Sequence, residues 1–186
     1  MDMADFFVVW LDKMTKGSKA FIVQDYVEAN VKNGVQFEGS TLLTGVAGGA
    51  DNDTIFLTGD LPVILKGRKI AYSGEGVSAF IYEAPAYTGG AEAEYQNANA
   101  INPVAGLSKI IVGSTITADG DLVFAPVHSL GNQSNQGKGA VVSAIESEHI
   151  LQPNTAYLLR LSSLDAQAQN IASHLSWFEG IPDMPA

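Results

Sequence analysis

The sequence predicts an all-β protein: an antiparallel β-sandwich of jelly-roll type, with about eight strands and a short helical arm at its N-terminus. Three observations predict this class. Apolar and polar residues alternate in short runs along most of the chain. Glycine is abundant, with 19 residues that often separate those runs. Charged residues make up only 16% of the 186 residues, below the roughly 25% of an average domain.

Residues 152–179 carry the clearest strand pattern. A Pro-Asn-Thr turn signal precedes an alternating run around Tyr157, and a second alternating run surrounds Trp177. These two runs predict the closing strands of the sandwich. An alternative stays open for residues 163–178, where apolar residues also recur at helical spacing after Ser163, a candidate N-cap.

The chain is expected to divide into an arm, residues 1–20, and a sandwich domain, residues 21–186. The apolar residues of the arm recur at helical spacing and predict a short helix. This helix either folds back on the core of its own domain or packs on a neighbouring subunit; the large apolar load of the arm is the reason for considering the second. The arm residues predicted to make contacts with a neighbouring subunit are Phe6, Phe7, Trp10 and Leu11.

Alternating runs predict further strands in the middle of the chain. We expect a bend or bulge at Gly67, and an edge strand or a bulge at Pro126, because proline cannot donate to a sheet. We expect a loop at residues 48–53 and a hairpin turn at residues 119–120. Residues 21–34 fit either a helix or a strand. The predicted strands are residues 35–44, 54–58, 63–72, 77–83, 109–117, 122–128 and 140–150.

Residues 85–107 form the longest stretch without a regular pattern, rich in Ala, Asn and Gly. A loop of this length inside a compact domain is usually functional or a contact element. Tyr87 and Tyr95 lie in this stretch. We therefore predict that both tyrosines contribute to contacts with other subunits.

Charge and composition exclude several classes of function. The formal net charge is −10, which disfavours both phosphate backbones and anionic membranes as partners. The chain has no cysteine, so disulfides and thiolate metal sites are excluded. The apolar run at residues 6–11 is too short to span a bilayer, and acidic residues precede it where a signal peptide carries basic ones. We expect a protein made and kept in the cytosol, at least until assembly.

No catalytic residue, metal site or cofactor site is predicted. His128, His149 and His174 lie in different predicted elements, whereas a metal site needs several converging ligands. Residues 51–53 and 119–121 resemble fragments of calcium loops, but neither continues into the full pattern, and we expect turns instead. There is no nucleophile elbow, phosphate-binding loop or zinc-protease motif.

Two weaker features point toward sugar chemistry. Glu146 and Glu148 lie two residues apart and could serve as an acid–base pair, although such a pair is usually solvated surface. Aromatic residues could form a platform for stacking sugars, although aromatics at strand spacing more often belong to a core or an interface. The platform would use Tyr72, Tyr82, Tyr87, Tyr95 and the two tryptophans.

From about residue 21 to 183 the chain resembles a group of small virion proteins of tailed bacteriophages, the head decoration (capsid cement) proteins. The resemblance implies a β-sandwich that forms a homo-oligomer, often a trimer, on the outside of a protein shell, with the major capsid protein as its partner. The residues that carry it are packing and turn residues. They are Asp53–Gly59, Pro62–Gly74, Val77–Glu83, Asn102-Pro103 and Leu151–Gly180, with its P-N-T-x-Y-L-L-R-L run and final W-F-E.

The residues and the resemblance together predict a structural virion protein. It would bind the outside of an assembled phage head as a decoration protein and stabilise that head, without enzymatic activity. The alternative is a phage tail or head-fibre component whose β-sandwich binds carbohydrate on a host surface. A glycan-modifying enzyme is the weakest hypothesis, since no acid–base pair or metal set can be named.

Overall fold

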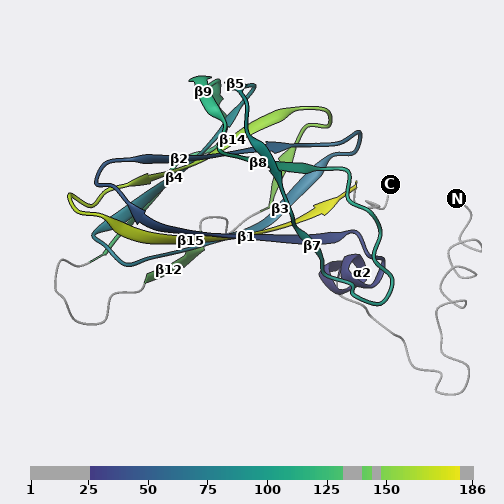
Figure 1. Ribbon diagram of the computed structural model, residues 1–186. Helices are drawn as coiled ribbons and strands as arrows, with labels where there is room; N and C mark the ends of the chain where they lie inside the picture. Colours follow the sequence, from purple (N-terminus) through teal and green to yellow (C-terminus); the bar gives the residue numbers. More distant parts are fainter. Residues whose placement is uncertain (1–25, 132–139, 144–147, 181–186) are drawn as a thin grey trace, which may run out of the picture.

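The structure, a computed structural model, describes residues 26–131, 140–143 and 148–180. Within this part of the chain, two antiparallel sheets face each other as two layers, and a short helix lies at one end (Figure 1). A two-stranded ribbon stands on the outer side of one sheet. The protein is therefore an all-β sandwich, as predicted, whereas the predicted arm at residues 1–20 lies outside the described residues.

The bounds of the elements are as follows. The described helix is α2 (Tyr26–Lys32). The six-stranded sheet contains β1 (Gln36–Val46), β3 (Val63–Tyr72), β7 (Gln96–Asn97), β12 (Ala140–Ser143), β13 (His149–Leu151) and β15 (Gln169–Glu179). The seven-stranded sheet contains β2 (Asp51–Leu57), β4 (Gly76–Glu83), β6 (Ala91–Ala93), β8 (Lys109–Val112), β10 (Asp121–Leu122), β11 (Val127–Leu130) and β14 (Ala156–Ser163). The ribbon pairs β5 (Ala86–Thr88) with β9 (Thr115–Ala118).

The two C-terminal strands occupy the centres of the two sheets. Strand β15 lies between β1 and β3, and β14 lies between β2 and β4. The strand prediction for this part of the chain is thus confirmed, and the helical alternative for residues 163–178 is wrong. Alternate residues of both strands enter the core, and only a short connection around residues 164–168 is left between them.

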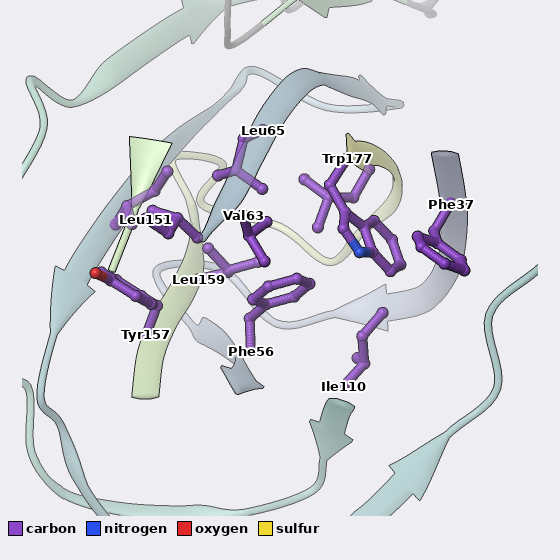
Figure 2. Packing of buried hydrophobic residues seen from close by; sticks show 11 residues of the cluster. Phe37, Phe56, Val63, Leu65, Ile110, Leu151, Tyr157, Leu159 and Trp177 are labelled. Carbon is purple, nitrogen blue, oxygen red and sulfur yellow. The ribbon is translucent and has the colours of Figure 1, made fainter. Parts of the chain in front are cut away.

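The main core surrounds Trp177, whose side chain is fully buried (Figure 2). Its ring lies 5.8 Å from Phe37, 5.3 Å from Phe56 and 5.0 Å from Tyr95, measured between ring centroids. Edge-to-face and offset aromatic pairs contribute roughly 0.5–1.5 kcal/mol each beyond their burial. These rings come from both sheets and from the segment after β6, so they join the layers at this end.

A bulge interrupts β3 at the predicted place. Ser176 lies opposite Gly67 and Trp177 lies opposite Leu65, so Lys66 is an extra residue in β3. An extra residue reverses the in–out alternation beyond it. As a result Arg68, which pairs with the core residue Leu175, enters the space between the sheets with only 4% of its surface exposed.

Two turn predictions are wrong. The predicted loop at residues 48–53 ends early, because β2 already begins at Asp51 and pairs with β14. Residues 119–120 do not close a hairpin, because β9 pairs with β5 while β10 pairs with β4. The cause lies in the predicted strand 109–117, which breaks at Gly113, a residue with φ of +71°. The break leaves β8 in the sheet and sends β9 into the ribbon.

Other local predictions are settled by the described residues. Helix α2 confirms the helical alternative for part of residues 21–34, and the chain turns after it at Gly34 with φ of +72°. Pro126 lies in the gap between β10 and β11, both of which pair with the outer side of β4, so the edge position is confirmed. The described strands number 15 rather than about eight, because edge strands are interrupted and residues 85–107 contain three short strands.

Candidate functional site

The predicted contact residues fall in different places. Phe6, Phe7, Trp10 and Leu11 lie outside the described residues. Tyr87 lies half-buried in the ribbon strand β5. Tyr95 packs on the aromatic core, and its hydroxyl donates to the Ser108 carbonyl at 2.7 Å. Burial, followed by the charges of Glu179 and Glu92, raises the pKa of Tyr95 to about 12. Tyr95 therefore anchors the segment in which it lies.

The 98–107 loop follows β7 and is held by asparagine side chains. Asn97 donates through Nδ2 to the carbonyls of Gly34 (2.6 Å) and Val104 (2.9 Å). Asn99 donates to the Lys32 carbonyl at 3.0 Å, and its Oδ1 accepts the amides of residues 101 and 102. These bonds tie the loop to the end of α2, next to which it passes in Figure 1. The fold therefore fixes the loop without any bound partner.

Glu179 fixes the far end of the same loop. Its carboxylate is buried and accepts the backbone amides of Leu107 (2.7 Å) and Ser108 (3.0 Å). The indole of Trp177 donates to the same carboxylate at 3.2 Å. A buried charge that accepts three N–H donors is well satisfied. The final W-F-E of the C-terminal strand thus fastens this loop to the sheet.

The 98–107 loop displays apolar side chains to solvent. Ile101 is 88% exposed, Val104 is 49% exposed and Leu107 is 46% exposed. Single exposed apolar residues are ordinary, but three on one fixed loop form a local apolar surface. This surface lies inside the predicted contact element at residues 85–107. It can bury area against another protein.

A second polar feature, the Arg160 cluster, lies on the outer face of the seven-stranded sheet. Arg160 of β14 donates two hydrogen bonds to Asp53 (2.7 and 3.1 Å) and two to Asp119 (2.7 and 2.8 Å). The Asp51 carboxylate lies 3.5 Å away, and the guanidinium lies 5.6 Å from the centre of the Tyr82 ring. The bonds to Asp53, opposed by burial and aided by Asp119, raise the pKa of Arg160. The cluster ties the end of the ribbon to the sheet.

Sequence reasoning missed this cluster. It assigned the aspartates at residues 51–53 and 119–121 to turns, whereas Asp53 projects from β2 beside Arg160 and Asp119 approaches from the ribbon. One available signal was the single arginine within the apolar run of β14, since a charge in such a strand needs a partner. The identity of that partner depends on strand register and could not be read from the pattern.

The predicted sugar platform does not assemble as one surface. Tyr72 and Trp177 are buried and Tyr95 packs on the core, while the other tryptophan lies outside the described residues. A smaller row remains on the outer face of the seven-stranded sheet. There Phe80 stacks with Tyr82 and lies edge-to-face with His128, with 6.0 Å between the ring centroids in each pair.

The three histidines stay separate in the structure. His128 of β11 shares a 2.7 Å hydrogen bond with Ser78. His149 of β13 stacks on Phe124 at 4.0 Å, and His174 of β15 lies 3.7 Å from Glu38. Among the residues that the structure describes, no three potential metal ligands form a group. Glu148 forms an ion pair with Lys66, whereas Glu146 lies outside the described residues.

The fold and these features define the chain as an all-β sandwich protein with a fixed, apolar surface loop. Comparisons of the chain with protein-family models, with curated proteins and with solved structures found no match. In the described ranges, no helix has the length and apolar character needed to cross a membrane. The resemblance to phage decoration proteins therefore stays a prediction.

Proposed function

We propose that this chain is a structural virion protein that decorates the outside of an assembled phage head and stabilises it without catalysis. The observation that carries the proposal is the 98–107 loop, which is fixed at both ends and exposes Ile101, Val104 and Leu107. A loop ordered before binding loses little conformational entropy on contact. Burying its apolar side chains contributes roughly 25 cal/mol per Å².

The strand order supports a jelly roll, the finer fold class of this proposal. The chain alternates between the sheets through β1, β2, β3 and β4, and then returns to place β14 and β15 between those earlier strands. Two interlocked Greek keys produce this kind of order. We assign the sandwich to the jelly-roll type, with the ribbon and the short strands of residues 85–107 as insertions.

The proposed partners are further copies of this chain and the major capsid protein. A homotrimer would present its loop three times. Three weak contacts would then add up to strong binding on a symmetric shell. Binding only the assembled shell would stabilise it by mass action. The low content of charged residues, 16%, supports a protein whose surface is used in contacts. The net charge of −10 argues against nucleic acid as a partner.

The loop can be tested with a matched pair of variants. The double variant Ile101→Ser, Val104→Ser removes apolar contact area, whereas Leu130→Ser, at a position 78% exposed on β11, serves as the control. We expect co-sedimentation with assembled phage heads to weaken at least tenfold for the double variant and to stay unchanged for the control. Unchanged binding by the double variant, with the same oligomeric state in light scattering, would contradict the proposal.

The arm needs a separate test, because its residues lie outside the described part of the chain. The variant Phe7→Ala, Trp10→Ala changes two residues of the arm and leaves the sequence of the sandwich and its loop unaltered. If the arm packs on a neighbouring subunit, this variant loses the oligomer seen for the unmodified chain. An unchanged oligomer with unchanged affinity for heads would exclude the arm as a contact element and leave the loop as the candidate.

One observation favours a second function, that of a tail or head-fibre component that binds host glycans. Phe80, Tyr82 and His128 form an outward-facing aromatic row beside Arg160, and aromatic faces can stack on sugars. A glycan array separates the two functions. Saturable, selective binding that is lost in Tyr82→Ala would favour the fibre role, and an array without selective binding leaves decoration as the function.

A further inference from the structure

A cavity of about 530 Å³ lies between the two sheets. Its walls come from β1 and β15 on one side and from β2, β8 and β14 on the other. The volume falls within the roughly 300–1,000 Å³ of typical small-molecule sites. Leucine and β-branched side chains form the apolar walls, and the polar residues that face in include Thr41, Asn52, Thr54 and Ser173. Such a mixed lining is typical of a ligand site.

Arg68 lines this cavity from β3 and has no acidic partner within the described part of the chain. The side chain is 4% exposed, and its hydrogen bond is a long one, from Nη1 to the Phe80 carbonyl at 3.5 Å. Among the described residues, no carboxylate forms an ion pair with it. Burial alone lowers the pKa of Arg68 to about 10. A buried guanidinium with most of its donors unused is rare and unfavourable.

Asn52 brings a second unused donor to the same cavity. It lies on β2 opposite the core residue Leu161, so its side chain enters the space between the sheets. Its Nδ2 is buried and has no hydrogen-bond partner among the residues that the structure describes. Buried polar atoms without partners are exceptions in folded proteins. Two residues that line one cavity thus carry donors without acceptors among the described residues, which points to an acceptor that comes from outside the described chain.

The position of Arg68 follows from the bulge at Lys66. Without that extra residue, the alternation from Leu65 would turn Arg68 toward solvent and Lys69 toward the core. Bulges frequently re-aim a side chain beside a functional site. On its other side Arg68 borders a second cavity of only about 10 Å³, which has room for at most one water molecule. A ligand therefore fits only on the side of the larger cavity.

We propose that the cavity binds a small carboxylic acid, whose carboxylate pairs with Arg68 while the rest of the molecule occupies the space between the sheets. The planar fork of arginine donors matches a carboxylate in a bidentate pair. Asp51 and Glu94, both exposed, also line the cavity and would repel a second negative charge. The site therefore suits a ligand with one carboxylate on an uncharged body, rather than phosphate. The proposed ligand binding does not depend on the proposed binding to phage heads.

The chain offers a direct spectroscopic test, because it contains only two arginines, Arg68 and Arg160. Their Nε–H signals can be followed in proton–nitrogen correlation spectra of the full chain. The probes are sodium D-glucuronate and sodium hexanoate, which carry the carboxylate on a hydroxylated and on an aliphatic body. D-glucose, 1-hexanol and inorganic phosphate serve as matched controls.

We expect at least one of the two acids to shift the Arg68 signal saturably and to leave the Arg160 signal in place, because Arg160 already holds two carboxylates. The neutral controls should leave both signals unchanged, and phosphate should bind at least tenfold more weakly. The proposal is overturned if neither acid shifts the Arg68 signal or if the matching neutral probe shifts it equally. It is also overturned if both arginine signals respond alike, or if phosphate binds as tightly as the acid.

Two variants locate the binding. Arg68→Met removes the charge, and Ser173→Leu fills part of the cavity while it keeps Arg68. Each should weaken binding of the acid at least tenfold, whereas Leu42→Ser, at a position 69% exposed on β1, should bind as the unmodified chain does. If Arg68→Met does not fold, binding of the acid by the Ser173→Leu variant tests whether the cavity is the site. Undiminished binding by the folded variants would place the acid elsewhere and refute the site.

Discussion

Two arginines of this chain occupy opposite environments on neighbouring layers of the same sandwich. Arg160 lies on the outer face of the seven-stranded sheet and makes four hydrogen bonds to Asp53 and Asp119. Arg68 lies between the sheets and makes one long bond to the carbonyl of Phe80. Their pKa values move apart accordingly, since carboxylates raise that of Arg160 while burial lowers that of Arg68.

The two arginines show that a charged side chain in a sheet can either hold the fold together or weaken it, depending on whether it finds carboxylate partners. Arg160 joins three segments that are distant in sequence, and its desolvation is offset by two carboxylates. Arg68 has no such compensation within the described chain, so its burial weakens the fold. A charge that destabilises the free protein while it lines a cavity is suited to a ligand that supplies the missing partner.

The largest expected effect comes from removal of the satisfied arginine. The variant Arg160→Met leaves Asp53 and Asp119 close together without their cation, and it releases the ribbon from the sheet. We expect the free energy of unfolding to fall by about 3 kcal/mol, as for other partly buried ion pairs that lose one member. Urea unfolding followed by tryptophan fluorescence measures this. A loss below about 1 kcal/mol would show that the cluster contributes no more to stability than an ordinary surface ion pair.

Removal of the unsatisfied arginine should act in the opposite direction. The variant Arg68→Met replaces an unpaired buried charge with an apolar side chain of similar length. We expect the free energy of unfolding, without added ligand, to stay equal or to rise by about 1–2 kcal/mol. The same urea experiment provides the answer. A fall of more than about 2 kcal/mol would mean that Arg68 holds the free fold together, and the contrast between the two arginines would disappear.

A smaller effect should appear with pH through His149, which borders the same small cavity as Arg68. Burial lowers the pKa of His149 below its ordinary value of 6.5. Below that value the unfolded chain binds a proton that the folded chain resists, so the free energy of unfolding falls as pH drops from about 7.5 to 5.5.

The variant His149→Phe, which keeps the ring stacked on Phe124, isolates this contribution. We expect the urea midpoint of the variant to change less over that pH interval than the midpoint of the unmodified chain. The difference should stay within about 1 kcal/mol. Parallel pH profiles for the two proteins would show that His149 does not titrate differently in the folded state.

The sequence predicted those features that depend on neighbouring residues. Period-two alternation located the strands around Tyr157 and Trp177, and Gly67 marked the bulge. Residues 85–107, expected to be irregular, contain the exposed 98–107 loop after three short strands, and their role in contacts stays a prediction. Local preference misled where a distant charge was decisive, because Asp53 favours turns by itself but is held in a strand opposite Arg160.

The rest of the candidate sites could not be predicted, because they depend on register. The loop is fixed by Asn97 through the Gly34 carbonyl, 63 positions away in sequence, and by Glu179 through amides 71 and 72 positions away. Arg68 lines the cavity because one extra residue in β3 turns this side chain inward. A shift of one position in that strand changes which side chains meet, and no local pattern records it.

The most direct measurement of the difference between the arginines is the free energy of unfolding of the unmodified chain and of Arg68→Met in rising concentrations of sodium D-glucuronate and of sodium hexanoate. For a ligand that binds only the folded state, stability grows with concentration and gains about 2.7 kcal/mol at 100 times the dissociation constant. We predict this rise for the unmodified chain with at least one of the acids and a flat line for Arg68→Met. Equal slopes for the two proteins, or no rise with either acid, would contradict the assignment of Arg68 to a ligand.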